Sequence, residues 1–230
     1  MPNGNSIWKK ALLFTAIATA VHTTLPCIGQ EAYTYDSYYY RRAALFEILP
    51  TDTSDIIMLG NSLTDGCEWH ELLQDNRIKN RGITADVMAG INDRLPAILK
   101  GKPAKIFIMA GINDISHDLS ADSISGMLWD IVAQIHRESP ATRIYVQSLL
   151  PVNTDMGYKR LQGKEPVISR LNELLQAQAG SRGYQYIELY SHFTAPGSHR
   201  LDPRYTNDGL HLTAEGYLLW GELLRPFIKE

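Results

Sequence analysis

Four short motifs along the chain carry the residue types that an ester-hydrolysing site needs. They are, in chain order, GNSLTDG at 60–66, NRG at 80–82, GIND at 111–114 and DGLH at 208–211. A serine nucleophile requires a base that takes its proton, an acid that orients the base, and donors that hold the developing oxyanion. Ser62, His211 and Asp208 match the first three requirements. The motifs therefore predict transfer of an acyl group to serine and then to water.

The oxyanion is predicted to bind three N–H donors: the backbone N–H groups of Ser62 and Gly82 and the side-chain amide of Asn113. Glycine lets its backbone approach a substrate closely, and asparagine adds a side-chain N–H. Each residue also has an ordinary structural interpretation, since Ser62 could cap a helix, Gly82 could form a turn and Asn113 could cap a loop. The catalytic interpretation rests on the occurrence of all four motifs in one chain.

A cysteine nucleophile is the alternative raised by Cys67, which lies close to Ser62 in the sequence. No histidine-containing motif accompanies Cys67, and a lone buried thiol is more common than a reactive one. We therefore interpret Cys67 as a packing residue. The histidines, cysteines and carboxylates show no spacing typical of metal ligands, so we predict neither a metal nor another cofactor.

Two aromatic residues, Trp69 and Tyr158, are candidates for binding substrate because they lie near the motifs or in a segment expected to rim the cleft. An aromatic face can stack on a sugar ring, although packing in the core or on the surface is the alternative for each of them. His117 and His199 are further candidates for lining the cleft, with solvent exposure as the alternative.

The elements that must position these motifs alternate along the chain. Strands are predicted from apolar runs at 55–59, 105–109 and 143–147 and from weaker runs at 77–81 and 184–188. Helical patterns are found at 84–99, 120–138, 165–179 and 213–228, and an N-terminal helix is expected to end at Leu49. This alternation predicts an α/β protein with right-handed crossovers, a five-stranded parallel sheet and a three-layer α/β/α sandwich.

The first three motifs each follow a predicted strand. Because the carboxyl ends of parallel strands meet at one edge of the sheet, Ser62, Gly82 and Asn113 should lie together. Asp208 and His211 precede the last predicted helix, in a loop that can reach the same edge. Residues three apart in such a turn face the same side, so Asp208 can accept a hydrogen bond from His211.

The first thirty residues differ from the rest. Lys9 and Lys10 precede an apolar stretch at 11–21, and a polar segment follows as far as Gln30. This pattern is typical of a secretory signal peptide, which we place at 1–29 and expect to be removed. The alternatives are an uncleaved anchor, for which the stretch is short, and a lipoprotein acylated at Cys27. The protein is thus predicted to be exported to the periplasm or beyond, in a bacterium.

The remaining 30–230 have the size of one domain. Of the 230 residues 44% are hydrophobic, the formal net charge is -3, and the mean hydropathy is -0.19. The negative net charge does not indicate a nucleic-acid partner. This part of the chain has no long apolar run of the kind that predicts stable membrane insertion. The expected partner is a small-molecule or glycan ester, and the oligomeric state is left open.

The four motifs together resemble those of the SGNH hydrolases of the GDSL esterase/lipase superfamily, over about 56–217. The resemblance implies a flavodoxin-like sheet, a metal-free Ser-His-Asp mechanism and an acyl-enzyme intermediate. One departure is Asn61, which stands where the family's name motif has aspartate. Asn61 and the NRG motif look most like the acetylhydrolase and carbohydrate-esterase branch.

The substrate is predicted from the segments that should rim the cleft, 151–165 and 191–207, which are rich in polar and charged residues. A pocket for long acyl chains would be mostly apolar, so we expect removal of short acyl groups, above all acetyl, from carbohydrates such as sialic acids. A lysophospholipase or thioesterase is the first alternative. A secreted glycan-binding protein that keeps the fold without turnover is the second.

Overall fold

The computed structural model describes residues 34–230, so the predicted signal peptide at 1–29 lies outside the described residues. Five parallel strands form one sheet in the order β2-β1-β3-β4-β5. The strands are β1 Ile56–Gly60, β2 Ile78–Gly82, β3 Lys105–Met109, β4 Arg143–Gln147 and β5 Gln185–Ile187. All five were predicted, and the three apolar runs form the adjacent central strands β1, β3 and β4, which the helices cover on both faces.

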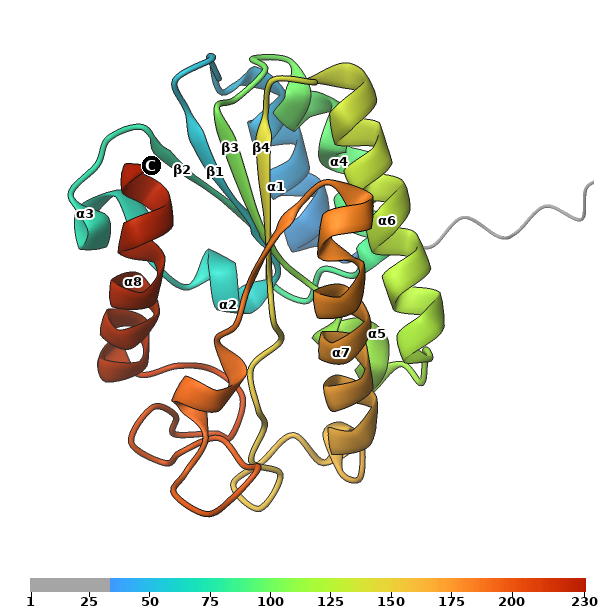
Figure 1. Cartoon of the computed structure of the whole chain (residues 1–230), viewed down its shortest axis with the longest axis vertical. Coiled ribbons are helices and arrows are strands. Elements are labelled where there is room, and N and C mark those ends of the chain that lie inside the picture. Colours follow the sequence, from blue (N-terminus) through green and yellow to red (C-terminus); the bar gives the residue numbers. More distant parts are fainter. Residues whose placement is uncertain (1–33) are drawn as a thin grey trace, which may run out of the picture. The chain divides into compact units, whose positions relative to one another are not determined.

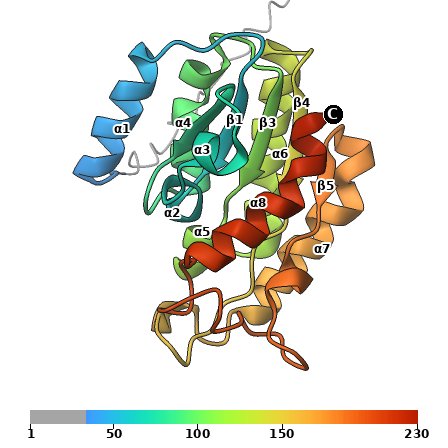
Figure 2. The ribbon, with the colours of Figure 1, turned by 90° about the vertical axis from the view of Figure 1, so that its left-hand side faces the viewer.

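Helices cover both faces of the sheet (Figure 1). The α-helices are α1 Ser37–Ile48, α2 Ser62–Asp65, α3 Trp69–Leu73, α4 Met88–Leu99, α5 Ile112–Ser116, α6 Ala121–Glu138, α7 Glu165–Arg182 and α8 Ala214–Lys229, and two 3-10 turns, η1 Lys159–Leu161 and η2 Tyr190–Phe193, lie in the loops. Helices α4, α6 and α7 pack side by side on one face, and α3 and α8 pack on the other (Figure 2). This arrangement confirms the predicted three-layer sandwich. None of the helices in 34–230 is long and apolar enough to cross a membrane.

Aromatic residues fill the layer between the sheet and α8. Trp69 and Trp220 are both fully buried, and their rings meet edge to face with centroids 4.8 Å apart. On β3 and β4, Phe107 and Tyr145 stack at 4.4 Å. Burial of such large rings makes a major contribution to the stability of this layer. The layer packs on the sheet whose carboxyl edge holds the motifs.

Helix α1 is held by contacts with α2, the short helix that follows β1. Asp36 caps the helix by accepting a hydrogen bond from Tyr39 N–H at 2.8 Å. Tyr38 Oη donates to Asp65 at 2.9 Å, and Arg42 lies 3.7 Å from the same carboxylate. The same helix also packs beside α4, where Tyr39 Oη donates a hydrogen bond to the Gly90 carbonyl oxygen.

Two helix boundaries differ from the prediction. Helix α4 begins at Met88, four residues later than expected, because the preceding loop includes Ala85 in a left-handed conformation with φ +63°. Helix α7 continues through Gly180 to Arg182 and ends at Gly183, whose φ of +75° suits a helix C-terminus. A glycine within a helix is tolerated when its neighbours pack well.

Asp114 caps α4 across the loop: both of its carboxylate oxygens accept from Met88 N–H, at 3.1 and 3.2 Å. Burial raises the pKa of Asp114 to about 6, and the hydrogen bond from Met88 offsets part of that rise. Because the native pKa lies above the unfolded value, the native protein holds this proton more tightly. Ionisation of Asp114 therefore costs stability as the pH rises from about 4 through 6.

We expect Asp114→Asn to remove this pH dependence. The difference in free energy of unfolding between the variant and the wild type should shift in favour of the variant by up to about 3 kcal/mol between about pH 4 and pH 7, because only the wild type has an Asp114 to ionise. Urea unfolding across this range measures the difference, and Asp130→Asn, at an exposed position of α6, controls for the loss of one negative charge. Parallel curves for Asp114→Asn and the wild type would contradict the expectation.

Candidate active site

Ser62 is the first residue of α2, directly after β1. The residue that caps this helix is Asn61, whose Oδ1 accepts from Leu63 N–H at 3.1 Å. The alternative that Ser62 merely caps the helix is therefore wrong. Among the described residues none accepts a hydrogen bond from Ser62 N–H, which leaves this donor available to a substrate.

Asp208 and His211 are brought together by a turn. Asp208 Oδ1 accepts from the N–H groups of Leu210 and His211, at 2.9 and 2.8 Å, and Oδ2 lies 2.9 Å from His211 Nδ1. The turn needs Gly209 with φ +89°, where a Cβ would meet the carbonyl oxygen of Asn153 at 2.1 Å. One carboxylate thus fixes both the backbone and the ring of His211.

The other nitrogen of the ring faces the serine: His211 Nε2 lies 3.0 Å from Ser62 Oγ. Burial alone would raise the pKa of Asp208, but hydrogen bonds from the His211 ring and from the backbone N–H groups outweigh it and hold the pKa below its usual value. An ionised Asp208 favours the tautomer with a proton on Nδ1. Nε2 is then the acceptor that a serine proton requires.

Asn113 belongs to α5, directly after β3. One N–H of its amide donates to the Asp86 carbonyl oxygen at 2.7 Å, which fixes the side chain and leaves the second N–H available, and Asn113 lines the adjacent cavity. The half-buried amide therefore remains a candidate donor for an oxyanion, as predicted.

The prediction for Gly82 is wrong. Its N–H donates to Asn80 Oδ1 at 2.8 Å and is therefore not available to an oxyanion. The Asn80 amide is held in this orientation because its Nδ2 donates to the carbonyl oxygens of Thr64, Asp65 and Cys67 at 3.0 to 3.1 Å. Gly82 is needed for a different reason: a Cβ there would lie 2.2 Å from Asp65 N.

Ala85 occupies the position that sequence reasoning missed. It lies three residues after Gly82, is exposed, and lines the same cavity as Asn113. No oxygen in the described part of the chain accepts its N–H. The backbone N–H of Ala85 is therefore a better candidate for the second oxyanion donor. A left-handed alanine gives no signal in a sequence, because that conformation is usually taken by glycine.

The sequence supports the chemistry suggested by this geometry. Residues 58–219, well over half of the chain, match the model of the GDSL-like Lipase/Acylhydrolase family. The chain belongs to this family. It is thus an acylhydrolase, in agreement with the resemblance found in the motifs.

Solved structures show the same fold. A protein from Streptococcus pneumoniae described as a platelet activating factor shares 25% identity with this acylhydrolase, with a TM-score of 0.75 over 83% of this chain and 92% of that one. An acylhydrolase from Bacteroides fragilis shares 23% identity, with a TM-score of 0.73 over 85% of this chain and 98% of that one.

Among curated proteins, the N-acylneuraminate cytidylyltransferase of Escherichia coli O18:K1:H7 is 26% identical over 184 residues. The match covers 76% of this acylhydrolase but only 41% of that relative. The acylhydrolase therefore spans less than half the length of the curated protein that it matches.

The two aromatic candidates differ. Trp69 is fully buried, and its Nε1–H donates to the Thr64 carbonyl oxygen at 2.8 Å. The prediction that it binds substrate is wrong, because the sheet and α8 cover it. Tyr158 is 41% exposed and lies against His211, with Oη 3.0 Å from Nδ1 and the rings edge to face at 5.3 Å. Its role in binding substrate stays a prediction.

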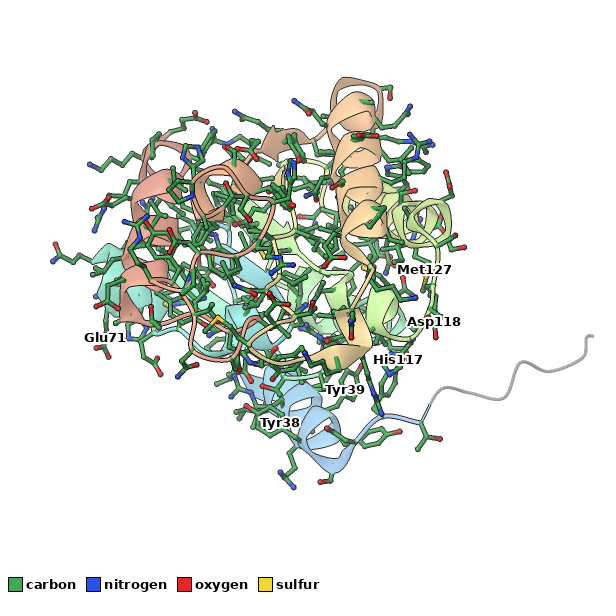
Figure 3. All side chains as sticks on the ribbon, turned by 90° about the horizontal axis from the view of Figure 1, so that it is seen from below. Tyr38, Tyr39, Glu71, His117, Asp118 and Met127 are labelled. Carbon is green, nitrogen blue, oxygen red and sulfur yellow. The ribbon has the colours of Figure 1, made fainter. Side chains whose placement is uncertain are left out.

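A cavity of about 530 Å³ lies beside this site. Its lining residues are Ala85, Asn113, Ser116, His117, Tyr158, Lys159, Arg160, Leu161 and Leu210. Figure 3 looks onto this end of the acylhydrolase and labels His117 and Asp118, which follow α5. The two oxyanion candidates Ala85 and Asn113 thus share a cavity with Tyr158, the neighbour of His211.

Cys67 is buried, and desolvation raises the pKa of its thiol to about 12. A thiol with this pKa is protonated at neutral pH, which argues against the alternative of a cysteine nucleophile. Within 34–230 no three histidine, cysteine or carboxylate side chains lie close enough together to hold a metal ion.

Replacement of Asn113 by alanine should lower kcat about 100- to 1000-fold and change KM little, because the amide is expected to bind the oxyanion more tightly than the ground state. Steady-state kinetics on p-nitrophenyl acetate measure both constants. The control is Asn92→Ala, at an exposed position of α4. A large rise in KM with kcat unchanged would instead assign Asn113 to ground-state binding.

Proposed function

We propose that this acylhydrolase removes short acyl groups, above all acetyl, from carbohydrates or other small esters through an acyl-enzyme on Ser62. The observation that carries the proposal is the continuous hydrogen-bonded series of three side chains: Ser62 Oγ at 3.0 Å from His211 Nε2, and His211 Nδ1 at 2.9 Å from Asp208 Oδ2. Serine, base and orienting acid are in contact without any rearrangement.

In this mechanism His211 takes the Ser62 proton as Oγ attacks the ester carbonyl carbon. The N–H groups of Ser62 and Ala85 and the amide of Asn113 bind the oxyanion. His211 returns the proton to the departing alcohol, which leaves an acyl-serine. Water then attacks the acyl-serine with His211 as base again, and the acid and free Ser62 are released.

The preference for short acyl groups is supported by the polar and basic residues among those that line the cavity, namely Asn113, Ser116, His117, Lys159 and Arg160. A long acyl chain would have to desolvate these groups without giving them partners. The curated relative adds support for a sugar substrate, since its name refers to N-acylneuraminate, an acidic sugar. The predicted export agrees with an action on glycans outside the cytoplasm.

Leu161 and Leu210 support the second candidate function, hydrolysis of longer acyl esters or thioesters. Both side chains are nearly fully buried and form the apolar part of the cavity lining. An acyl chain could lie along them while its ester reaches Ser62.

Hydrolysis of p-nitrophenyl acetate, butyrate and decanoate distinguishes the two functions. We expect kcat/KM to fall as the acyl chain lengthens. A higher kcat/KM for decanoate would favour the second function. Absence of serine-dependent turnover of all three esters, and of acetylated glycans, would favour a glycan-binding protein without catalysis.

A further inference from the structure

The cavity beside the site carries basic groups on one wall. His117, Lys159 and Arg160 line it, and no carboxylate is among its lining residues. Lys159 Nζ donates to the Thr154 carbonyl oxygen at 2.6 Å, which fixes the ammonium group while leaving two of its N–H donors. This wall is therefore positively charged although the chain as a whole is acidic.

Three carboxylates close to this wall in the sequence are engaged with other basic residues. Asp118 pairs with Lys164, Asp155 pairs with Arg200, and Asp208 contacts His211. Within the described part of the chain, Arg160 makes no ion pair and donates no side-chain hydrogen bond. Its planar guanidinium has five donors and is suited to a two-pronged contact with a carboxylate.

The cavity lining also holds apolar groups: Leu161, Leu210 and the exposed ring of Tyr158. An acetyl group has too few atoms to fill about 530 Å³, so the alcohol part of an acetyl ester must occupy most of the space. A pyranose with an acidic substituent matches both kinds of group, because its C–H face packs on apolar and aromatic groups while its carboxylate meets the basic residues.

We propose that the cavity binds an acidic sugar through its carboxylate, with Arg160 as the main partner and Lys159 and His117 beside it. The preferred substrates are then acetyl esters of carboxylate-bearing sugars. This inference rests on the proposed function and names its substrate class. It makes Arg160 a specificity-determining residue.

A matched pair of substrates tests the inference: a monoacetylated methyl glucuronide and the corresponding methyl glucoside, which differ only in carboxylate versus hydroxymethyl. For the wild type we expect kcat/KM to be at least about tenfold higher for the glucuronide, as a charge-assisted contact allows. Arg160→Gln should bring the ratio close to one. Arg170→Gln, at an exposed position of α7, should keep the wild-type ratio.

Equal kcat/KM values for the two sugars in the wild type would overturn the inference, while serine-dependent turnover of p-nitrophenyl acetate would leave the proposed function standing. An acid preference that persists in Arg160→Gln would overturn the role of Arg160. If neither sugar ester is hydrolysed, calorimetric titration with methyl glucuronide and methyl glucoside decides. Tighter binding of the glucuronide that Arg160→Gln abolishes supports the inference, and equal or no binding overturns it.

Discussion

Replacement of Ser62 by alanine should lower kcat for p-nitrophenyl acetate by a factor of about 10⁴ or more, with little change in KM. Alanine removes the only atom that can form the acyl-enzyme, whereas His211 and Asp208 keep their mutual contact at 2.9 Å. The residual rate should come from the oxyanion donors and from binding alone. Steady-state kinetics on purified protein measure the loss.

The matched control is Ser181→Ala, at an exposed position near the end of α7, which should retain wild-type kinetics. A burst of p-nitrophenol in wild-type protein that is absent from Ser62→Ala would locate the loss in acylation. If Ser62→Ala hydrolysed the ester at close to the wild-type rate, the proposed mechanism would be wrong.

The second large effect concerns stability. Arg94→Met should lower the free energy of unfolding by about 3–5 kcal/mol. The Arg94 side chain is 2% exposed; its Nε–H donates to Asp86 Oδ2 at 2.9 Å, and its other N–H groups donate to the carbonyl oxygens of Arg81 and Gly60. Methionine fills much of the volume but leaves Asp86 buried without its cation.

The loss should grow with pH. In the wild type burial raises the pKa of Asp86 to about 6, and Arg94 offsets part of that rise. Without Arg94 the native pKa should rise further, so the ionised form becomes less compatible with folding. An acid with a raised native pKa loses stability as the pH rises from its unfolded pKa to its native pKa. In Arg94→Met this loss continues to a higher pH, so the difference from wild type should be larger at about pH 8 than at about pH 5.

Urea unfolding at these two pH values measures both effects. Arg77→Met is the control, because Arg77 pairs with Asp75 at an exposed surface position and its loss should cost under about 1 kcal/mol. Equal, small losses for Arg94→Met and Arg77→Met would show that the buried pair contributes no more than a surface pair.

The fold could be predicted from the sequence because its strands are local and apolar. Residues 106–109 show the principle: an uninterrupted apolar run between polar and glycine-containing segments forms most of a central strand that is buried on both faces. Helix boundaries were less accurate where backbone conformation depends on partners distant in sequence. Helix α4 starts at Met88 because Asp114, twenty-six residues away, accepts its N–H.

The site was predictable where a residue type has few alternatives. The motifs that contain Ser62, Asp208 and His211 identified three side chains that form one hydrogen-bonded series in the structure. The backbone donor was assigned wrongly, since the choice between Gly82 and Ala85 depends on where Asn80 points. Trp69 was assigned wrongly because a sequence does not show which face of α3 meets α8.

Helix α1 has a consequence for the minimal unit of this enzyme. All the residues proposed for acyl transfer lie after β1, so a shortened chain that starts at Ile56 would contain every one of them. Such a chain would lack Tyr38 and Arg42, which contact Asp65 at the end of α2, the helix that Ser62 begins. Helix α1 therefore contacts the short helix that carries the nucleophile although it takes no part in the chemistry, and we expect the shortened chain to hold Ser62 less firmly against His211.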